Sequence, residues 1–230
     1  MGAVDTPSAL AAPPWFPVVG AMIGAAGGGV YVAARHGLPP TVASALAIAC
    51  GLLITGAFHN DGLADMADAF GGGWTKERRM EILKDSRHGT YGVVSLVIVL
   101  IIQVASLASL SGRHGLLVLI AAEALARAGA IALMALMTPV RADGLAASST
   151  RSVSRLAIVI GIVSGVVITV ASIGWWSIGA LGAVVVGVGA VGSLAQRKIG
   201  GVVGDVLGAA EQVAFTGVLV VCVALANRAR

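Results

Sequence analysis

The chain has 230 residues, of which 57% are hydrophobic and 11% are charged, and its mean hydropathy is +0.95. Soluble domains contain about 25% charged residues, so this composition excludes an ordinary water-soluble domain and indicates a membrane protein. The net charge of +4 comes without a basic block interleaved with aromatic residues, which make up 4% of the chain, so nucleic-acid binding is not expected. Two cysteines in apolar runs, Cys50 and Cys222, exclude a disulfide framework and a zinc site.

Apolar runs long enough to cross a bilayer recur along the whole chain. A spanning helix needs about 20 predominantly apolar residues, and the candidate runs are residues 15–34, 41–58, 91–110, 115–137, 156–175, 176–195 and 213–226. The last is short unless it begins near Val206, which would draw Glu211 into its first turn. The pattern predicts an all-α, polytopic integral membrane helical bundle with about seven transmembrane helices, or six if residues 156–195 are divided differently. We expect one membrane-embedded domain over residues 1–230.

Positive charge falls mainly on one side of this predicted topology. With seven spans, ten Lys and Arg residues share the side of the N-terminus: Lys76, Arg78, Arg79, Lys84, Arg87, Arg141, Arg151, Arg155, Arg197 and Lys198. By the positive-inside rule this side is cytoplasmic. We therefore expect a multi-pass protein of the cytoplasmic (inner) membrane with its N-terminus inside and a cytoplasmic active-site loop at residues 59–90.

The start of that loop carries three regularly spaced aspartates. Asp61, Asp65 and Asp68 stand at positions i, i+4 and i+7, so they share one face if the second helix continues through them. Neighbouring carboxylates repel one another, and a hard cation such as Mg²⁺, Mn²⁺ or Ca²⁺ removes that repulsion. A solvated acidic helix end is the alternative, but three carboxylates on one face favour a metal site.

The end of the loop adds cations and a fourth carboxylate. Thr75 is a predicted N-cap for a short amphipathic helix, and Lys84, Asp85, Ser86 and Arg87 then precede a glycine-flanked turn. Such donors can hold a phosphate, while Asp85 would join the metal site.

Two further polar features lie outside the loop. The glycine-rich run at residues 200–208, with Gly204 and Asp205, could present backbone N–H groups to a phosphate or pack against the first loop. Within the fourth span, Glu123 and Arg127 are four residues apart. They form either a structural pair or a functional one in which Arg127 reaches toward a phosphate.

Three of these motifs together resemble the cobalamin synthase family, the adenosylcobinamide-GDP ribazoletransferases. They are H-x-D-G-L-A-D-x-A-D from His59, K-D-S-R-x-G-T-x-G from Lys84 and G-G-x-x-G-D-x-L-G-A from Gly200, in family order and at family-like spacing. Residues 15–20 also resemble the start of the family's first span. His88 departs from the pattern, because an aliphatic residue is expected there.

The resemblance implies a membrane enzyme of vitamin B12 assembly. A hydroxyl of α-ribazole or its 5'-phosphate attacks the diphosphate of adenosylcobinamide-GDP, GMP leaves, and Mg²⁺ is required. By this resemblance Asp61, Asp65, Asp68 and Asp85 hold the metal, Lys84, Arg87 and Arg79 contact the diphosphate, and His59 or a metal-free carboxylate serves as base. Expected partners are these two substrates and the lipid bilayer. A homo-oligomer stays open, because glycine-rich residues 24–29 and 179–192 can pack within one chain or against a second copy.

Other functions are less consistent with the spacing. A CDP-alcohol phosphotransferase would place Ala-Arg after its D-G pair and a D-x-x-x-D later, whereas here Asp65-Met66 follows and the D-x-x-x-D is Asp61 to Asp65. A prenyltransferase would carry a second aspartate-rich motif, and Gly204-Asp205 is a poor one. A transporter would show broken hydrophobic segments at the midplane.

Overall fold

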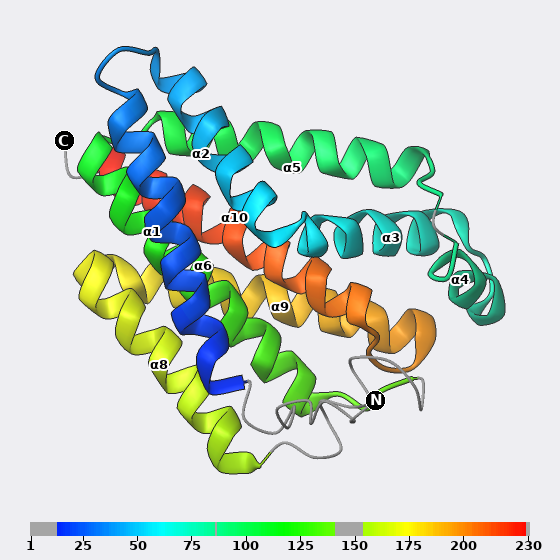
Figure 1. Ribbon diagram of the computed structural model, residues 1–230. Coiled ribbons are helices and arrows are strands. Elements are labelled where there is room, and N and C mark those ends of the chain that lie inside the picture. The colour runs from blue at the N-terminus through cyan, green and yellow to red at the C-terminus, as the bar shows by residue number, and fades with distance from the viewer. Residues whose placement is uncertain (1–12, 86, 141–153, 229–230) are drawn as a thin grey trace, which may run out of the picture.

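The structure is a computed structural model that describes residues 13–85, 87–140 and 154–228. Over these residues the chain is helical, with one isolated bridge between Pro139 and Val202. The elements in order are η2 (Pro13–Trp15), α1 (Phe16–Ala34), α2 (Pro40–Thr55), α3 (Phe58–Gly72), α4 (Lys76–Ile82), α5 (Thr90–Ala108), α6 (Gly112–Leu136), α8 (Arg155–Ile173), η3 (Gly174–Trp176), α9 (Ser177–Ile199) and α10 (Gly204–Arg228). Figure 1 shows α6 inside the bundle, and it packs against α1, α8, α9 and α10.

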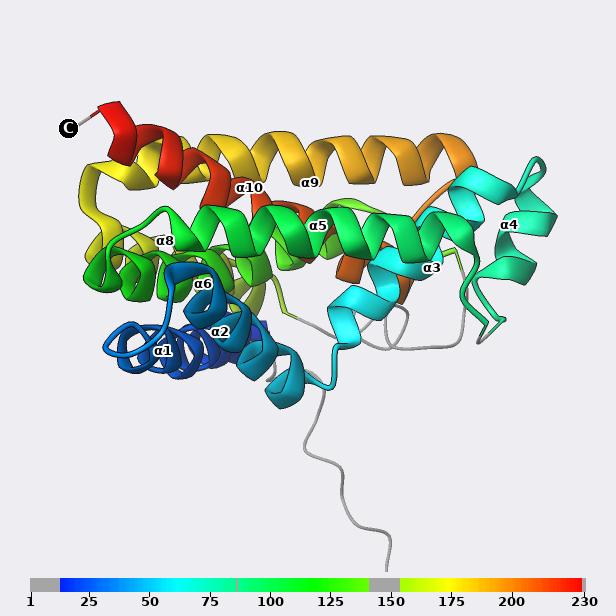
Figure 2. The ribbon, with the colours of Figure 1, turned by 90° about the horizontal axis from the view of Figure 1, so that it is seen from above.

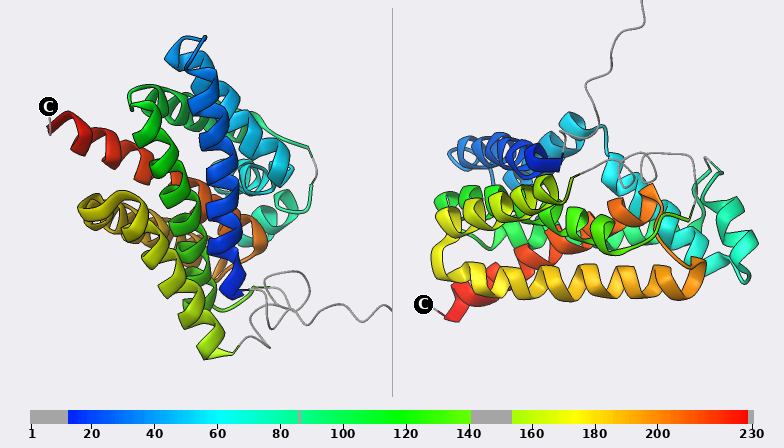
Figure 3. Two further views of the ribbon diagram at one scale, coloured as in Figure 1. Left: turned by 60° about the vertical axis from the view of Figure 1, so that its left-hand side comes forward. Right: turned by 90° about the horizontal axis from the view of Figure 1, so that it is seen from below.

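The described helices form a multi-pass membrane bundle. By length and composition, five helical segments can cross a membrane, or six if the bent pair α2 and α3 is one span. One of the five, Arg155–Ile199, contains α8, η3 and α9. The chain reverses at η3, so that α8 and α9 run in opposite directions (Figures 1 and 3). The predicted polytopic all-α bundle is therefore confirmed. Helix α10 begins at Gly204 and includes Glu211, as the longer version of the last span requires.

The connections gather at two opposite ends of the bundle, as the alternating topology predicts. At one end, the Val140 N–H donates to the Val202 carbonyl beside the Pro139–Val202 bridge, and the Lys198 ammonium donates to the Phe70 carbonyl. At the other end, the Tyr31 hydroxyl lies 2.8 Å from the carbonyl oxygens of both Leu107 and Leu110, and ties α1 to the α5–α6 connection.

Glycines on one face of α1 let it approach α6 closely. An added Cβ at Gly20 would lie 2.5 Å from the Glu123 carbonyl oxygen, and one at Gly24 would collide with the Leu119 carbonyl group. Small residues at such spacing allow the backbones of membrane helices to come together. This face of α1 therefore packs within the chain, whereas Gly29, on the other side, has nothing within 4 Å.

The second helix does not continue through the aspartates, which lie instead on a separate helix, α3. Helix α2 ends at Thr55, and α3 begins at Phe58 after a bend of 91°. Gly56 and Ala57 both adopt left-handed backbone conformations, with φ of 61° and 56°, which ends the helix and turns the chain. As a result α3 lies between α5 and α10, and the described residues from 59 to 89 form α3, α4 and their connections (Figure 2).

The close approach of α1 to α6 makes a prediction about stability. Gly24→Val should lower the apparent melting temperature of the detergent-purified protein by about 5 °C or more, because the added methyl groups meet the α6 backbone. Gly29→Val, on the open side of the same helix, is the matched control and should leave the melting temperature unchanged. Equal effects of the two changes would contradict this packing.

Candidate functional site

Two of the predicted aspartates form a group with a histidine that sequence reasoning did not select. The Oδ1 atoms of Asp61 and Asp65 lie 3.6 Å and 3.5 Å from the two ring nitrogens of His88. These three residues can offer ligand atoms that all lie within 4.8 Å of one another. Asp61 and His88 are exposed and Asp65 is half-buried, so the group opens to the surface.

The donor set of this group suits a divalent cation. Mg²⁺ is usually bound in proteins by one or two carboxylates together with waters and substrate phosphates, and Asp61 and Asp65 provide two carboxylates on successive turns of α3. An imidazole is a common ligand for transition metals but not for Mg²⁺. We therefore assign the carboxylates of Asp61 and Asp65 as the candidate Mg²⁺ ligands. His88 is better suited to contact the other ligands of the cation than to bind the cation itself.

Asp68 has a different role in the structure. Its side chain is buried, and its two carboxylate oxygens accept hydrogen bonds from the backbone N–H groups of Gly89 at 2.6 Å and Gly92 at 2.8 Å. An aspartate that accepts from the first N–H groups of a helix satisfies donors that lack an intrahelical partner. Asp68 therefore fixes the start of α5 against α3, although the sequence placed it among the metal ligands.

Asp85 is not brought to the group formed by Asp61, Asp65 and His88. It pairs instead with Arg87, whose Nη2 lies 2.6 Å from the Asp85 Oδ2. This charge-assisted hydrogen bond lowers the pKa of the Asp85 carboxyl to about 2. The predicted fourth ligand and the predicted phosphate-binding Arg87 thus bind each other here. Ser86 lies outside the described residues.

The other two predicted phosphate-binding cations of this region differ in their surroundings. The Arg79 guanidinium donates to the carbonyl oxygens of Lys198 and Trp74, each at 3.0 Å, and so fastens α4 to the end of α9. Its Nε is buried and has no hydrogen-bond partner within the described part of the chain. The Lys84 side chain is exposed. Arg79 therefore has a structural role in this conformation.

The glycine-rich start of α10 packs against the first turns of α3, one of the two roles that the sequence allowed for it. An added Cβ at Gly62 would lie 2.9 Å from the Asp205 carbonyl oxygen, and one at Gly208 would lie 3.2 Å from the His59 carbonyl oxygen. Gly204 itself has nothing within 4 Å of an added Cβ. Two of the three sequence motifs therefore meet backbone to backbone at this crossing.

Arg127 lies in a buried ion cluster. It donates to the carboxylate of Glu123 on its own helix, and its Nη1 lies 3.1 Å from Oε1 of Glu211 on α10. Arg127 is 7% exposed and Glu211 is 1% exposed. Because buried charges are costly unless paired, this cluster supports the structural role of Arg127 that the sequence left open, with Glu211 as a partner from a distant part of the chain.

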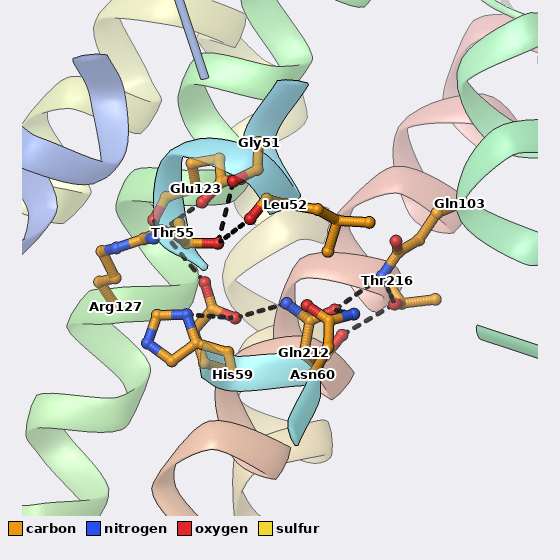
Figure 4. A network of polar contacts seen from close by, with 11 residues as sticks. Gly51, Leu52, Thr55, His59, Asn60, Gln103, Glu123, Arg127, Gln212 and Thr216 are labelled. Atoms are coloured by element: carbon orange, nitrogen blue, oxygen red, sulfur yellow. Dashed lines mark hydrogen bonds and ion pairs between the residues drawn. The ribbon is translucent and has the colours of Figure 1, made fainter. Parts of the chain in front are cut away.

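The ion cluster extends into an uncharged polar network (Figure 4). Gln212 donates to Glu211 at 2.9 Å and accepts from Gln103 at 3.0 Å and from Asn60 at 3.3 Å. His59 joins it through Nδ1, which lies 3.4 Å from Oε2 of Glu211. The network links α3, α5, α6 and α10 inside the bundle.

A large cavity, which we call the groove, opens beside this network. Its volume is about 770 Å³, and it lies between α1, the α2–α3 corner, α6 and the start of α10. Most of its wall is apolar, including Met22, Ala130 and Leu207, and its polar side chains are those of Thr55, His59 and Arg127. Small-molecule sites typically have volumes of roughly 300–1,000 Å³ and this kind of lining.

Sequence reasoning missed several residues of the site. His88 was set aside because an aliphatic residue was expected there, although it stands only three residues after Asp85. Glu211, Gln212 and Gln103 lie in apolar helices, and their polarity at that depth was the available signal. Their mutual partners are far apart in the chain, up to 152 residues for Asn60 and Gln212.

The fold and site define a polytopic helical membrane protein with a surface-exposed acidic group beside a mostly apolar cavity. Comparison with known proteins agrees: the chain belongs to the family described as cobalamin-5-phosphate synthase, whose model matches residues 3–223. An adenosylcobinamide-GDP ribazoletransferase of Bradyrhizobium diazoefficiens is 42% identical over 220 residues, covering 94% of this chain and 84% of the relative. One of Azorhizobium caulinodans is 41% identical, covering 85% of this chain and 77% of the relative. No solved structure matches the chain.

The grouping of ligands predicts how point variants change cation binding. Asp61→Asn and Asp65→Asn should each weaken Mn²⁺ binding at least about tenfold, because each removes one of two charged oxygen ligands. Binding is measured on the purified protein by electron paramagnetic resonance of free Mn²⁺. Asp85→Asn should leave the affinity unchanged, as should Glu77→Gln on exposed α4. If Asp85→Asn weakened Mn²⁺ binding as much as Asp61→Asn does, Asp85 would be a ligand of the cation after all.

Proposed function

We propose that this chain joins adenosylcobinamide-GDP to α-ribazole or its 5'-phosphate and releases GMP, as the names of its relatives indicate for those proteins. The observation that carries the proposal is the pair of carboxylates, Asp61 and Asp65, on the turns of α3 that pack against the glycine-rich start of α10. The family's first and third motifs thereby become parts of one site, and the second contributes His88.

The reaction depends on neutralising the charge of the phosphates and aligning the two reactants more than on covalent catalysis by the protein. Displacement at a diphosphate develops negative charge on the phosphoryl oxygens and on the leaving phosphate. When bound by Asp61 and Asp65, Mg²⁺ would bind diphosphate oxygens and offset this charge. His88 and the exposed Lys84 lie on the same connection before α5 and supply further donors toward an anionic substrate.

The protein chain also supplies the positioning. Asp68 holds the start of α5, and with it His88, against the aspartate helix. Gly62 and Gly208 hold the same helix against α10. In-line attack depends on such fixed placement of both reactants, and these contacts support a site preformed by packing.

We place the site at the cytoplasmic end of the bundle in the inner membrane. The ends of α3 and α9 meet there, and the basic residues Arg79, Arg197 and Lys198 gather at this end. Positive charge marks the cytoplasmic side of a multi-pass protein.

Product formation tests the activity. Purified protein in lipid vesicles should release GMP from adenosylcobinamide-GDP only when α-ribazole or its phosphate and Mg²⁺ are present. The nucleotide and corrinoid products are measured by chromatography. Asp61→Asn and Asp65→Asn should lower turnover by about 10²-fold or more, whereas Glu77→Gln should retain wild-type turnover. Wild-type turnover in both aspartate variants at saturating Mg²⁺ would contradict the assignment of Asp61 and Asp65 to the active site.

Cysteine labelling tests the orientation. Gly72 and Gly37 are both exposed, an added Cβ meets nothing within 4 Å at either, and they lie at opposite ends of the bundle. A membrane-impermeant maleimide should label Gly72→Cys in inverted vesicles but not in intact spheroplasts, and Gly37→Cys should show the reverse. The opposite pattern would invert the proposed topology.

A further inference from the structure

A second cavity, which we call the lateral cavity, opens on the outside of the bundle where α6 and α9 end. Its volume is about 440 Å³, and the described residues that line it belong to the last turn of α6, to Met137 and to the last three turns of α9. Leu136 is 84% exposed and Gly189 is also exposed, so the cavity faces outward. Because α6 and α9 are long and apolar enough to cross the membrane, its apolar part faces lipid.

The lining of the lateral cavity changes from apolar to polar toward the end of α9. On this helix the lining residues run from Gly189 through Ser193 to Gln196 and Arg197, and α9 ends at Ile199. Eight residues of α-helix, from 189 to 197, rise by about 12 Å. The polar layer on each side of a bilayer is only about 5–8 Å thick. With Arg197 in that layer, Gly189 lies in the hydrocarbon, so the cavity suits a molecule with a polar head and an apolar tail.

Arg197 brings an uncompensated positive charge to the polar end of the lateral cavity. Its side chain is exposed and makes no hydrogen bond or ion pair with the described residues. The neighbouring Lys198 is engaged elsewhere, since its ammonium donates to the Phe70 carbonyl at 3.2 Å. A guanidinium can bind a phosphate through two parallel hydrogen bonds. Basic pockets between membrane helices bind the head groups of anionic lipids in this way.

We propose that the lateral cavity binds one anionic phospholipid, with its phosphate at Arg197 and Gln196 and an acyl chain along Leu133, Leu136 and Gly189. A lipid reaches this opening from the side by diffusion in the bilayer, and the charge of Arg197 favours an anionic head group over a zwitterionic one. The lateral cavity shares no lining residue with the groove among the described residues. The lipid site therefore does not depend on the proposed function.

The bound lipid braces the ends of α6 and α9 against each other. The two helices already touch along one edge, where an added Cβ at Gly192 would lie 2.6 Å from a methyl group of Leu133. Met137 lines the lateral cavity and precedes Thr138, whose carbonyl accepts from the Val202 N–H at 3.0 Å. An acyl chain on the open side adds contacts to both helices, and a ligand that binds only the folded state raises its stability.

Titration with defined lipids tests the head-group contact. In native mass spectrometry, delipidated protein should bind one dioleoylphosphatidylglycerol at least about tenfold more tightly than dioleoylphosphatidylcholine. Arg197→Gln should abolish this preference, because it removes the charge that meets the phosphate. Arg155→Gln removes an exposed charge at the start of α8, outside the lateral cavity, and should keep the preference. Equal affinity for the two lipids in the wild type, or an unchanged preference in Arg197→Gln, would overturn the proposal.

Filling the lateral cavity tests the position of the acyl chain. Gly189 and Gly182 are both exposed on α9, and an added Cβ meets nothing within 4 Å at either, but of the two only Gly189 lines the lateral cavity. Gly189→Trp should weaken phosphatidylglycerol binding about tenfold or more, whereas Gly182→Trp should bind as the wild type does. Phosphatidylglycerol should accordingly raise the melting temperature of Gly182→Trp but not that of Gly189→Trp. Equal binding and equal stabilisation in the two variants would place the lipid elsewhere and contradict the proposal.

Discussion

The backbone contact between α3 and α10 positions most of the candidate site. Gly62 faces Asp205 at a distance that leaves no room for a Cβ, and Gly208 faces His59 at a distance that leaves little room for one. The bend at Gly56 and Ala57 makes this contact possible, since a straight continuation of α2 would carry the aspartates away from α10. One crossing therefore sets both the outward direction of Asp61 and Asp65 and the inward direction of His59.

The buried ion cluster fixes how α3 and α10 are aligned along each other where they cross. Arg127 on α6 binds Glu211 on α10, and Glu211 also faces His59 on α3. A charged group in a membrane bundle is costly when unpaired, so a slip of α10 along α3 would break several polar contacts at once. Apolar packing alone tolerates such slips more easily. The cluster thus fixes the register of the helices that carry the site.

The sequence predicted the membrane bundle and the Thr75 cap, whose hydroxyl accepts from the Arg78 N–H at 3.2 Å, because apolar length and capping are local properties. It also allowed the packing of the glycine-rich run against the first loop as one of two alternatives. It failed where the decisive interaction is between distant residues. Nothing local distinguishes Asp68, which caps α5, from Asp61 and Asp65, which carry the same side chain on the same face. The pairing of Asp85 with Arg87 and the arrival of His88 beside the aspartates depend on the path of the chain after α4. The bend at Ala57 was equally hidden, since a non-glycine residue rarely adopts a positive φ.

The division between an acidic surface and an apolar groove matches the chemistry of the two substrates. A diphosphate carries its charge in a compact group, and charge is stabilised at the exposed end of the bundle where cations and water reach it. An apolar wall such as that of the groove instead favours neutral groups that lose little by leaving water. The first turns of α3 carry both kinds of surroundings, because His59 lines the groove and the carboxylate of Asp61 is exposed. His59 lies where these surroundings meet, because it lines the groove and its Nδ1 faces the buried Glu211 carboxylate.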